Sequence, residues 1–226
     1  LLISLMITAL MAAGMPMTAF AKPDWPSDTG IESEAGLVMD ADSGAVLFGQ
    51  NIHVQKAPAS ITKILTALVV IENSSLDDQV TMTATGVSGV TDGGANISSQ
   101  LDEVFTMEQC LYAIMVASAN DIALQVAEHV GGSVDAFVQT MNARAQELGC
   151  TNTVFTNPTG LPDENQHTTA HDMALIMEAA MANETFRTIA ATTSYTLPAT
   201  NVSGGERVLT NSFTMINNAS DGYYEP

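Results

Sequence analysis

The segment from residue 57 to residue 71 constrains the fold most, because it predicts an apolar helix that carries one charge. Its large apolar residues recur at the spacing of a single helix face, at Ile61, Ile64, Leu65, Leu68 and Val69. The other positions are mostly Ala, Val and Thr, so we expect the helix to be buried on nearly all sides. The charge belongs to Lys63, and a buried ammonium is costly unless it is paired or loses its proton.

Ser60 lies three residues before Lys63, on the adjoining part of the same face. Pro58 predicts that Ser60 occupies the first helical turn, where free backbone N–H groups point outward. A hydroxyl, an amine made basic by burial and a positive helix end are what an acyl-transfer nucleophile needs. However, Ser-x-x-Lys also arises by chance, and a lysine in an apolar helix can instead extend to solvent.

The composition excludes one class of function. The 226 residues suffice for one sizeable domain or one and a half, with 46% hydrophobic content for a core. Six Lys and Arg oppose 25 Asp and Glu, which gives a net charge of −19 and a surface that repels nucleic acid. The acidic residues are scattered, which is typical of a solvated surface rather than an interaction tail.

Residues 1–21 form an uncharged, apolar run that ends in Ala19-Phe20-Ala21, a small-x-small cleavage pattern. We interpret this run as a secretory signal peptide truncated at its start, because no initiator Met or basic segment precedes it. Gly14 and Pro16 interrupt the run, which disfavours a membrane anchor. The protein is therefore expected to be exported, with residues 22–34 as a polar linker and residues 35–226 as one incomplete domain.

The remaining pattern predicts a mixed α+β fold, with a helical layer inserted after an N-terminal β-hairpin. The hairpin pairs residues 36–40 with residues 45–50, and a second small hairpin pairs residues 194–197 with residues 207–209. Helices are predicted near residues 58–72, 106–117, 121–130, 133–148 and 169–180. Capping patterns begin three of these helices, at Thr106 with Gln109, at Ser133, and at Thr169 with Asp172. Residues 77–100 and 151–167 are predicted to be loops, the first with short extended pieces.

Neither cysteine nor histidine patterns predict a metal site. Cys110 and Cys150 could pair in an exported protein, but we favour two unpaired, half-buried thiols. His167 and His171 are four residues apart, yet Thr169 caps a helix between them, so they do not share a helical face. We interpret both histidines as structural, and we predict no metal and no cofactor.

A second polar motif, Ser118-Ala119-Asn120, lies at the break between two predicted helices. These residues are suited to capping the following helix. They are equally suited to face Ser60 and Lys63, with Ser118 relaying a proton between the amine and a leaving group. Asn120 could then hold Lys63 by its oxygen and bind a substrate carbonyl by its nitrogen. Spacing alone leaves both interpretations open.

The segments Pro58-Ala59-Ser60-Ile61-Thr62-Lys63 and Ser118-Ala119-Asn120-Asp121 together resemble the low-molecular-mass penicillin-binding proteins. These are the serine D-alanyl-D-alanine carboxypeptidases, or peptidase S11 family, and their motif set is Ser-x-x-Lys, Ser-x-Asn and Lys-Thr-Gly. Further resemblance lies in residues 40–47, 137–149, 157–161 and 167–173, so that it extends over residues 35–226.

The resemblance implies a β-lactamase/transpeptidase-like fold and a function in peptidoglycan and cell wall biogenesis. Ser60 would attack the carbonyl between two D-alanines of a stem peptide, Lys63 would take its proton, Ser118 would relay a proton, and Asn120 would bind substrate. β-Lactam antibiotics would acylate the same serine. The implied location is outside the cytoplasm, in the cell wall or at the outer face of the membrane, with attachment possible through a C-terminal tail.

The third family motif is absent, since none of Lys22, Lys56 and Lys63 is followed by Thr-Gly. We therefore expect a piece of a longer protein that lacks the later sheet strands and is itself nearly inactive. One alternative is a class A-like β-lactamase, with Glu164 as the deacylating base, although the Glu-x-x-Leu-Asn pattern is missing. The other alternative is a non-catalytic relative associated with the cell wall or the spore.

Overall fold

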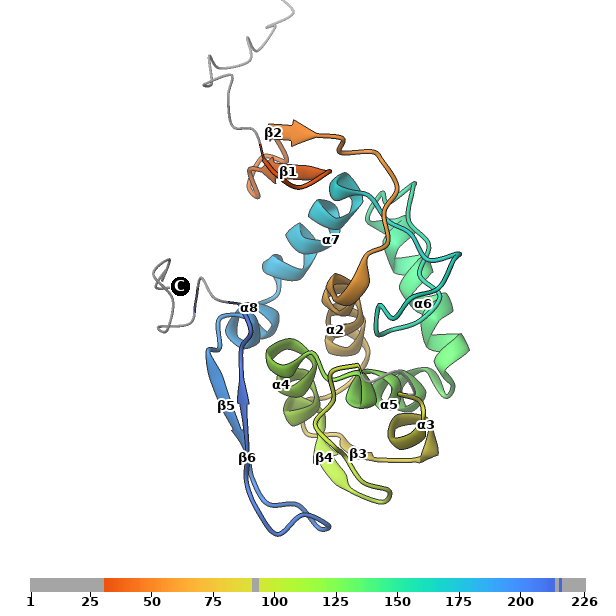
Figure 1. Ribbon diagram of the computed structural model, residues 1–226, viewed down its shortest axis with the longest axis vertical. Helices are drawn as coiled ribbons and strands as arrows, with labels where there is room; N and C mark the ends of the chain where they lie inside the picture. The colour runs from red at the N-terminus through yellow and green to blue at the C-terminus, as the bar shows by residue number, and fades with distance from the viewer. Residues whose placement is uncertain (1–30, 91–93, 214–215, 217–226) are drawn as a thin grey trace, which may run out of the picture. The chain divides into compact units, whose positions relative to one another are not determined.

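The computed structural model describes residues 31–90, 94–213 and 216 (Figure 1). The chain divides into two units, Leu1–Glu32 and Ser33–Pro226, and all the elements below belong to the second. The predicted signal peptide and most of the predicted linker lie outside the described residues, so both stay predictions. Within the described ranges, no helix combines the length and the apolar character that crossing a membrane requires.

The elements observed in the described ranges confirm the mixed α+β class. In chain order they are β1 (Gly36–Met39), β2 (Val46–Gln50), η1 (Ala59–Ile61), α2 (Thr62–Asn73), β3 (Gln79–Thr81), α3 (Ala84–Ser88), β4 (Val104–Thr106), α4 (Met107–Ala117), α5 (Asn120–Gly131), α6 (Val134–Glu147), α7 (Ala170–Ala182), α8 (Glu184–Ala190), β5 (Ser194–Leu197) and β6 (Arg207–Thr210). The strands pair antiparallel as β1–β2, β3–β4 and β5–β6. Both predicted hairpins are therefore confirmed.

Helix α2 is the element against which the other long helices pack, namely α4, α5, α6 and α7 (Figure 1). Its side chains Leu65, Ala67, Val69 and Val70 are fully buried, as its apolar composition predicts. Ile61 was expected on the same buried face, but it is 48% exposed. The reason is that Ile61 belongs to η1, which precedes the point where α2 enters the core.

The predicted helix caps are observed with one correction. Thr106 and Gln109 form a complete capping box on α4, and Ser133 caps α6. At α7 the Thr169 side chain accepts from the backbone N–H of Asp172, but the reciprocal bond is missing. The Asp172 carboxylate instead accepts from Asn152 N and Thr153 Oγ1, each at 2.8 Å. It therefore holds the loop before α7 rather than completing the cap.

Two short helices and one strand pair were not predicted. Helix α3 lies in the segment predicted as loop with short extended pieces. Strand β3 agrees with one such extended piece, but its pairing with β4, from just beyond the segment, was not predicted. Gly86 lies within α3, and an added Cβ would be 2.9 Å from Asp121 O. A glycine is needed there because α3 packs closely on α5, and not because the chain makes a turn. Helix α8 has only seven residues, begun by an Asn183 cap, which is too short for a periodic apolar pattern.

Candidate active site

Ser60 and Lys63 lie together at the start of α2. The Nζ atom of Lys63 lies 3.3 Å from Ser60 Oγ and donates a hydrogen bond of 2.6 Å to the backbone oxygen of Thr159. Lys63 is only 3% exposed, whereas Ser60 is exposed. The amine therefore sits behind the hydroxyl, and the hydroxyl faces solvent, from where a substrate would approach.

The environment of Lys63 shifts the amine toward its neutral form. Burial lowers the pKa of the Lys63 amine to about 8. In the described part of the chain, no carboxylate forms an ion pair with it that would restore the ordinary value. With this pKa, roughly one amine in ten is neutral at pH 7 and carries a lone pair that can accept a proton. Such a tuned amine next to a hydroxyl is typical of an activated nucleophile.

The turn that carries Ser60 differs from the predicted first turn of the helix. Ser60 lies in η1, and the preceding Ala59 has a φ of 49°, in the left-handed region. A non-glycine residue pays about 1–2 kcal/mol for this conformation, so it persists only where its surroundings impose it. Gly160 supplies such a constraint, because a Cβ on it would lie 1.8 Å from the Ala59 oxygen. The backbone of the loop before α7 thus lies directly against the turn that carries Ser60.

The side chain of Asn157 shapes this same loop. Its Oδ1 accepts from Thr159 N (3.1 Å), Thr159 Oγ1 (2.8 Å) and Gly160 N (2.8 Å). Its Nδ2 donates to the oxygen of Leu161 at 3.0 Å. The turn folded in this way directs the Thr159 carbonyl to Lys63. The sequence analysis assigned no role to Asn157 or Thr159, although Asn-Pro-Thr-Gly was among the segments that resembled the family.

Ser118 and Asn120 lie at the junction between α4 and α5, as predicted. Ser118 ends α4 in the left-handed conformation (φ 55°) and is half-buried, and Asn120 begins α5 and is 4% exposed. Among the described residues, Asn120 Oδ1 has no hydrogen-bond partner. The predicted bond from Lys63 to this oxygen is therefore not formed, since the amine donates to Thr159 instead. The catalytic role of Ser118 and the substrate-binding role of Asn120 stay predictions.

Asp121 anchors the segment that lies beside Asn120. Its carboxylate is 4% exposed and accepts from the backbone N–H groups of Ile97 (3.3 Å) and Ser99 (3.1 Å) and from Ser99 Oγ (2.7 Å). It lies in the first turn of α5, where the helix dipole also favours a negative charge. Asp121 thereby fixes residues 97–99 next to the second motif.

The cysteines, the histidines and Glu164, which the sequence also singled out, make no hydrogen bond or ion pair with Ser60 or Lys63 in the described residues. Cys110 and Cys150 are unpaired as predicted, but they are fully buried rather than half-buried. His171 lies against His53, with 5.0 Å between ring centroids. No group of three or more His, Cys, Asp or Glu in the described ranges could hold a metal ion. Glu164, the candidate base of a β-lactamase, is exposed on its loop.

Comparison with known proteins shows to which family the chain is similar. Residues 21–223 match the family described as D-alanyl-D-alanine carboxypeptidase, peptidase S11. The chain is 34% identical over 190 residues to the carboxypeptidase DacF of Bacillus subtilis and 37% identical over 194 residues to DacB2 of Mycobacterium tuberculosis. These alignments cover 81% and 84% of this chain, but only 48% and 61% of the length of the relatives.

Solved structures agree with this result. A mutant of a Streptomyces DD-transpeptidase superposes with a TM-score of 0.80 at 27% identity, covering 86% of this chain and 79% of that one. A Mycobacterium tuberculosis D-alanyl-D-alanine carboxypeptidase superposes with a TM-score of 0.73 at 34% identity, covering 81% and 67%. The predicted transpeptidase-like fold is thereby confirmed. The chain belongs to the peptidase S11 family, the serine-type D-alanyl-D-alanine carboxypeptidases.

Proposed function

We propose that this protein removes the terminal D-alanine from peptidoglycan stem peptides through an acyl-enzyme on Ser60. The observation that supports this most strongly is the buried Lys63 amine, 3.3 Å from Ser60 Oγ, with its pKa lowered to about 8. Membership of the family supports the substrate class, a peptide that ends in D-Ala-D-Ala. The same chemistry supports β-lactam antibiotics as a second class of ligand. A peptidoglycan substrate supports a location outside the cytoplasm, which is part of this proposal.

Acylation begins with transfer of the Ser60 hydroxyl proton to the lone pair of Lys63 Nζ. Ser60 Oγ then forms a bond to the carbonyl carbon between the two D-alanines. The backbone N–H of Ser60 is one donor to the developing oxyanion. When the C–N bond breaks, the proton passes from the Lys63 ammonium through the Ser118 hydroxyl to the departing D-alanine nitrogen.

The Thr159 carbonyl gives the neutral amine a defined orientation. A neutral amine has two hydrogens and one lone pair, and the 2.6 Å bond to Thr159 O uses one hydrogen. This bond leaves the lone pair available toward Ser60. After the proton transfer, the ammonium is held where water is excluded, so burial favours handing the proton on.

Deacylation returns the enzyme to its starting state. A water molecule attacks the ester carbonyl and gives a proton to the neutral Lys63 amine. When the bond from the carbonyl carbon to Ser60 Oγ breaks, the Lys63 ammonium gives this proton to Oγ, which restores the serine hydroxyl and the neutral amine. In a β-lactam the leaving nitrogen stays tethered to the acyl group, so the ester persists and marks the serine. The Nδ2 atom of Asn120 is suited to bind a backbone carbonyl of the substrate. None of these steps uses a metal or a cofactor.

The test is labelling of the full-length protein with a fluorescent penicillin. Ser60→Ala should abolish the label, and Ser88→Ala, at an exposed serine of α3, should leave it intact. Undiminished labelling of the Ser60→Ala protein would overturn the assignment. Rapid turnover of a chromogenic cephalosporin by the wild type would favour the β-lactamase alternative instead.

A further inference from the structure

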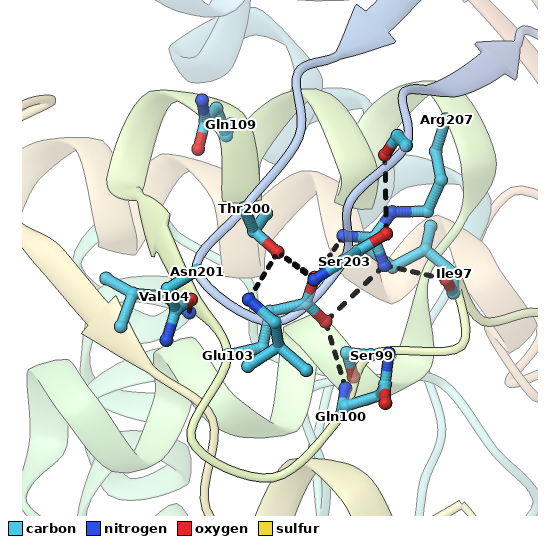
Figure 2. A network of polar contacts seen from close by, with 12 residues as sticks. Ile97, Ser99, Gln100, Glu103, Val104, Gln109, Thr200, Asn201, Ser203 and Arg207 are labelled. Carbon is cyan, nitrogen blue, oxygen red and sulfur yellow. Dashed lines mark hydrogen bonds and ion pairs between the residues drawn. The ribbon is translucent and has the colours of Figure 1, made fainter.

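Figure 2 shows a network of polar contacts built around a buried ion pair. The Glu103 carboxylate is fully buried and pairs with the Arg207 guanidinium. It also accepts from Thr200 Oγ1 at 2.7 Å and from Gln100 N at 3.0 Å. A carboxylate without water is costly unless such partners surround it. The network therefore forms one defined arrangement, and loss of a single partner should loosen it.

Arg207 joins the C-terminal hairpin to the segment before β4. Its Nη1 atom donates to the backbone oxygen of Ile97 at 3.3 Å and to Glu103 at 3.5 Å (Figure 2). Its guanidinium also lies over the Phe105 ring, 5.2 Å from the ring centroid. From the loop between β5 and β6, Asn201 Oδ1 accepts from Val104 N at 2.9 Å. The hairpin thus holds residues 97–104 by contacts at Ile97, Glu103 and Val104.

The same segment is also bonded to the start of α5. Ile97 N and Ser99 N donate to the Asp121 carboxylate, and Asn120 N donates to the oxygen of Ala95 at 2.8 Å. Residues 94–103 therefore connect the Arg207–Glu103 pair to Asn120 through an unbroken series of hydrogen bonds and backbone. Of the residues in this series, Asn120 is the one proposed to touch substrate.

Packing against Gly94 fixes the Asn120 side chain. A Cβ on Gly94 would lie 2.4 Å from Asn120 Nδ2, so the backbone of this segment lies directly against the amide. Asn120 Oδ1 has no hydrogen-bond partner among the described residues. Among the described residues, the amide is therefore not oriented by a hydrogen bond to its oxygen. The position of the amide depends instead on the segment that packs against it.

We propose that Arg207 and Glu103 are positioning residues for substrate binding: they brace residues 94–103 and thereby hold the Asn120 amide in place. The inference rests on the function proposed above, because it concerns how strongly the site binds substrate before acylation. It separates the role of Asn120 from that of Lys63, which the Thr159 carbonyl holds independently. Loss of the brace should weaken binding and leave the proton transfer unchanged.

The test measures acylation of the full-length protein over a range of penicillin concentrations, which separates the dissociation constant from the limiting rate. Arg207→Met should raise the dissociation constant about tenfold, the cost of one misplaced polar contact, and leave the limiting rate and its pH midpoint unchanged. Arg207→Lys should recover part of the affinity. The matched control is Arg144→Met, which breaks the ion pair between α6 and Glu72 (2.8 Å).

Each outcome of this test is decisive. Two results would overturn the brace. One is a similar increase of the dissociation constant in Arg207→Met and in Arg144→Met, and the other is an unchanged dissociation constant in folded Arg207→Met. If Arg207→Met does not fold, Thr200→Val removes one bond to Glu103 and is expected to show a smaller increase in the same constant. If the wild type is not labelled, the proposed function fails instead. In that case, faster hydrogen exchange of the Ile97 and Ser99 amides in Arg207→Met would still support the brace, and unchanged exchange would refute it.

Discussion

Replacing Gly160 with alanine tests whether the loop before α7 positions Ser60, the proposed nucleophile. The new methyl carbon would lie 1.8 Å from the oxygen of Ala59 and 3.0 Å from the nitrogen of Ser60. Because such carbons essentially never come closer than 3.0 Å to a neighbour, the two backbones must separate by about 1.2 Å, the difference between these distances. The shift falls on the turn that holds Ser60 Oγ near Lys63.

The size of the effect follows from this displacement. Ser60 Oγ and Lys63 Nζ are already 3.3 Å apart, so a further separation near 1.2 Å takes them out of hydrogen-bond reach. Misplacement of reacting groups by about 1 Å costs about 100-fold in rate. We therefore expect Gly160→Ala to reduce the second-order rate constant for penicillin acylation by about 100-fold, measured by gel fluorescence or mass spectrometry.

Gly132→Ala is the matched control. Gly132 has a φ of +74°, close to the +82° of Gly160, but nothing lies within 4 Å of its added Cβ. Both variants should lose about 1 kcal/mol of stability from the left-handed conformation, yet Gly132→Ala should be acylated within about twofold of the wild-type rate. Acylation of folded Gly160→Ala at the wild-type rate would refute the claim that this contact positions Ser60.

Two further predictions concern buried ionisable groups. Burial raises the pKa of both Cys110 and Cys150, the latter to about 12, so neither thiol should react with iodoacetamide until denaturant is added; alkylation of the native protein would contradict this. The pKa of Lys63 falls from 10.5 to about 8, so the unfolded chain binds more protons between these values and the stability of the wild type rises with pH across that window. The penalty of about 3 kcal/mol is fully present at pH 7, so Lys63→Met should gain about 2 kcal/mol there after loss of the bond to Thr159. Above pH 10.5 the penalty is gone and only the lost bond remains, so in urea titrations the variant should be about 1 kcal/mol less stable than the wild type. Equal stabilisation at both pH values would contradict the assigned cause.

Local sequence patterns predicted much of this fold because their signals lie within a few residues. The capping box of Thr106 with Gln109 needs only three residues, and the hairpin of β1 and β2 needs only its turn. Helix α3 was not predicted because Gly86 indicates a loop in the sequence. In the structure, this glycine instead allows α3 to pack closely against α5. A requirement imposed by another element cannot be read from the glycine itself.

The candidate site was predictable in part for the same reason. Ser60 and Lys63 are three residues apart, so helical spacing brought them together. The hydrogen bond from Lys63 to Thr159 joins residues 96 positions apart, and the pair of Arg207 with Glu103 spans 104 positions. The sequence analysis instead expected Asn120 to hold Lys63, because a side-chain amide is visible in a sequence and a backbone carbonyl is not.

The pH dependence of Ser60 acylation tests the central claim most directly. If the buried Lys63 amine takes the serine proton, the rate constant should rise tenfold per pH unit and level off at the pKa of Lys63, about 8. Lys63→Met should lose this dependence together with most of the rate. A wild-type rate that stays constant as the pH crosses this value, in a protein that remains folded, would contradict the account.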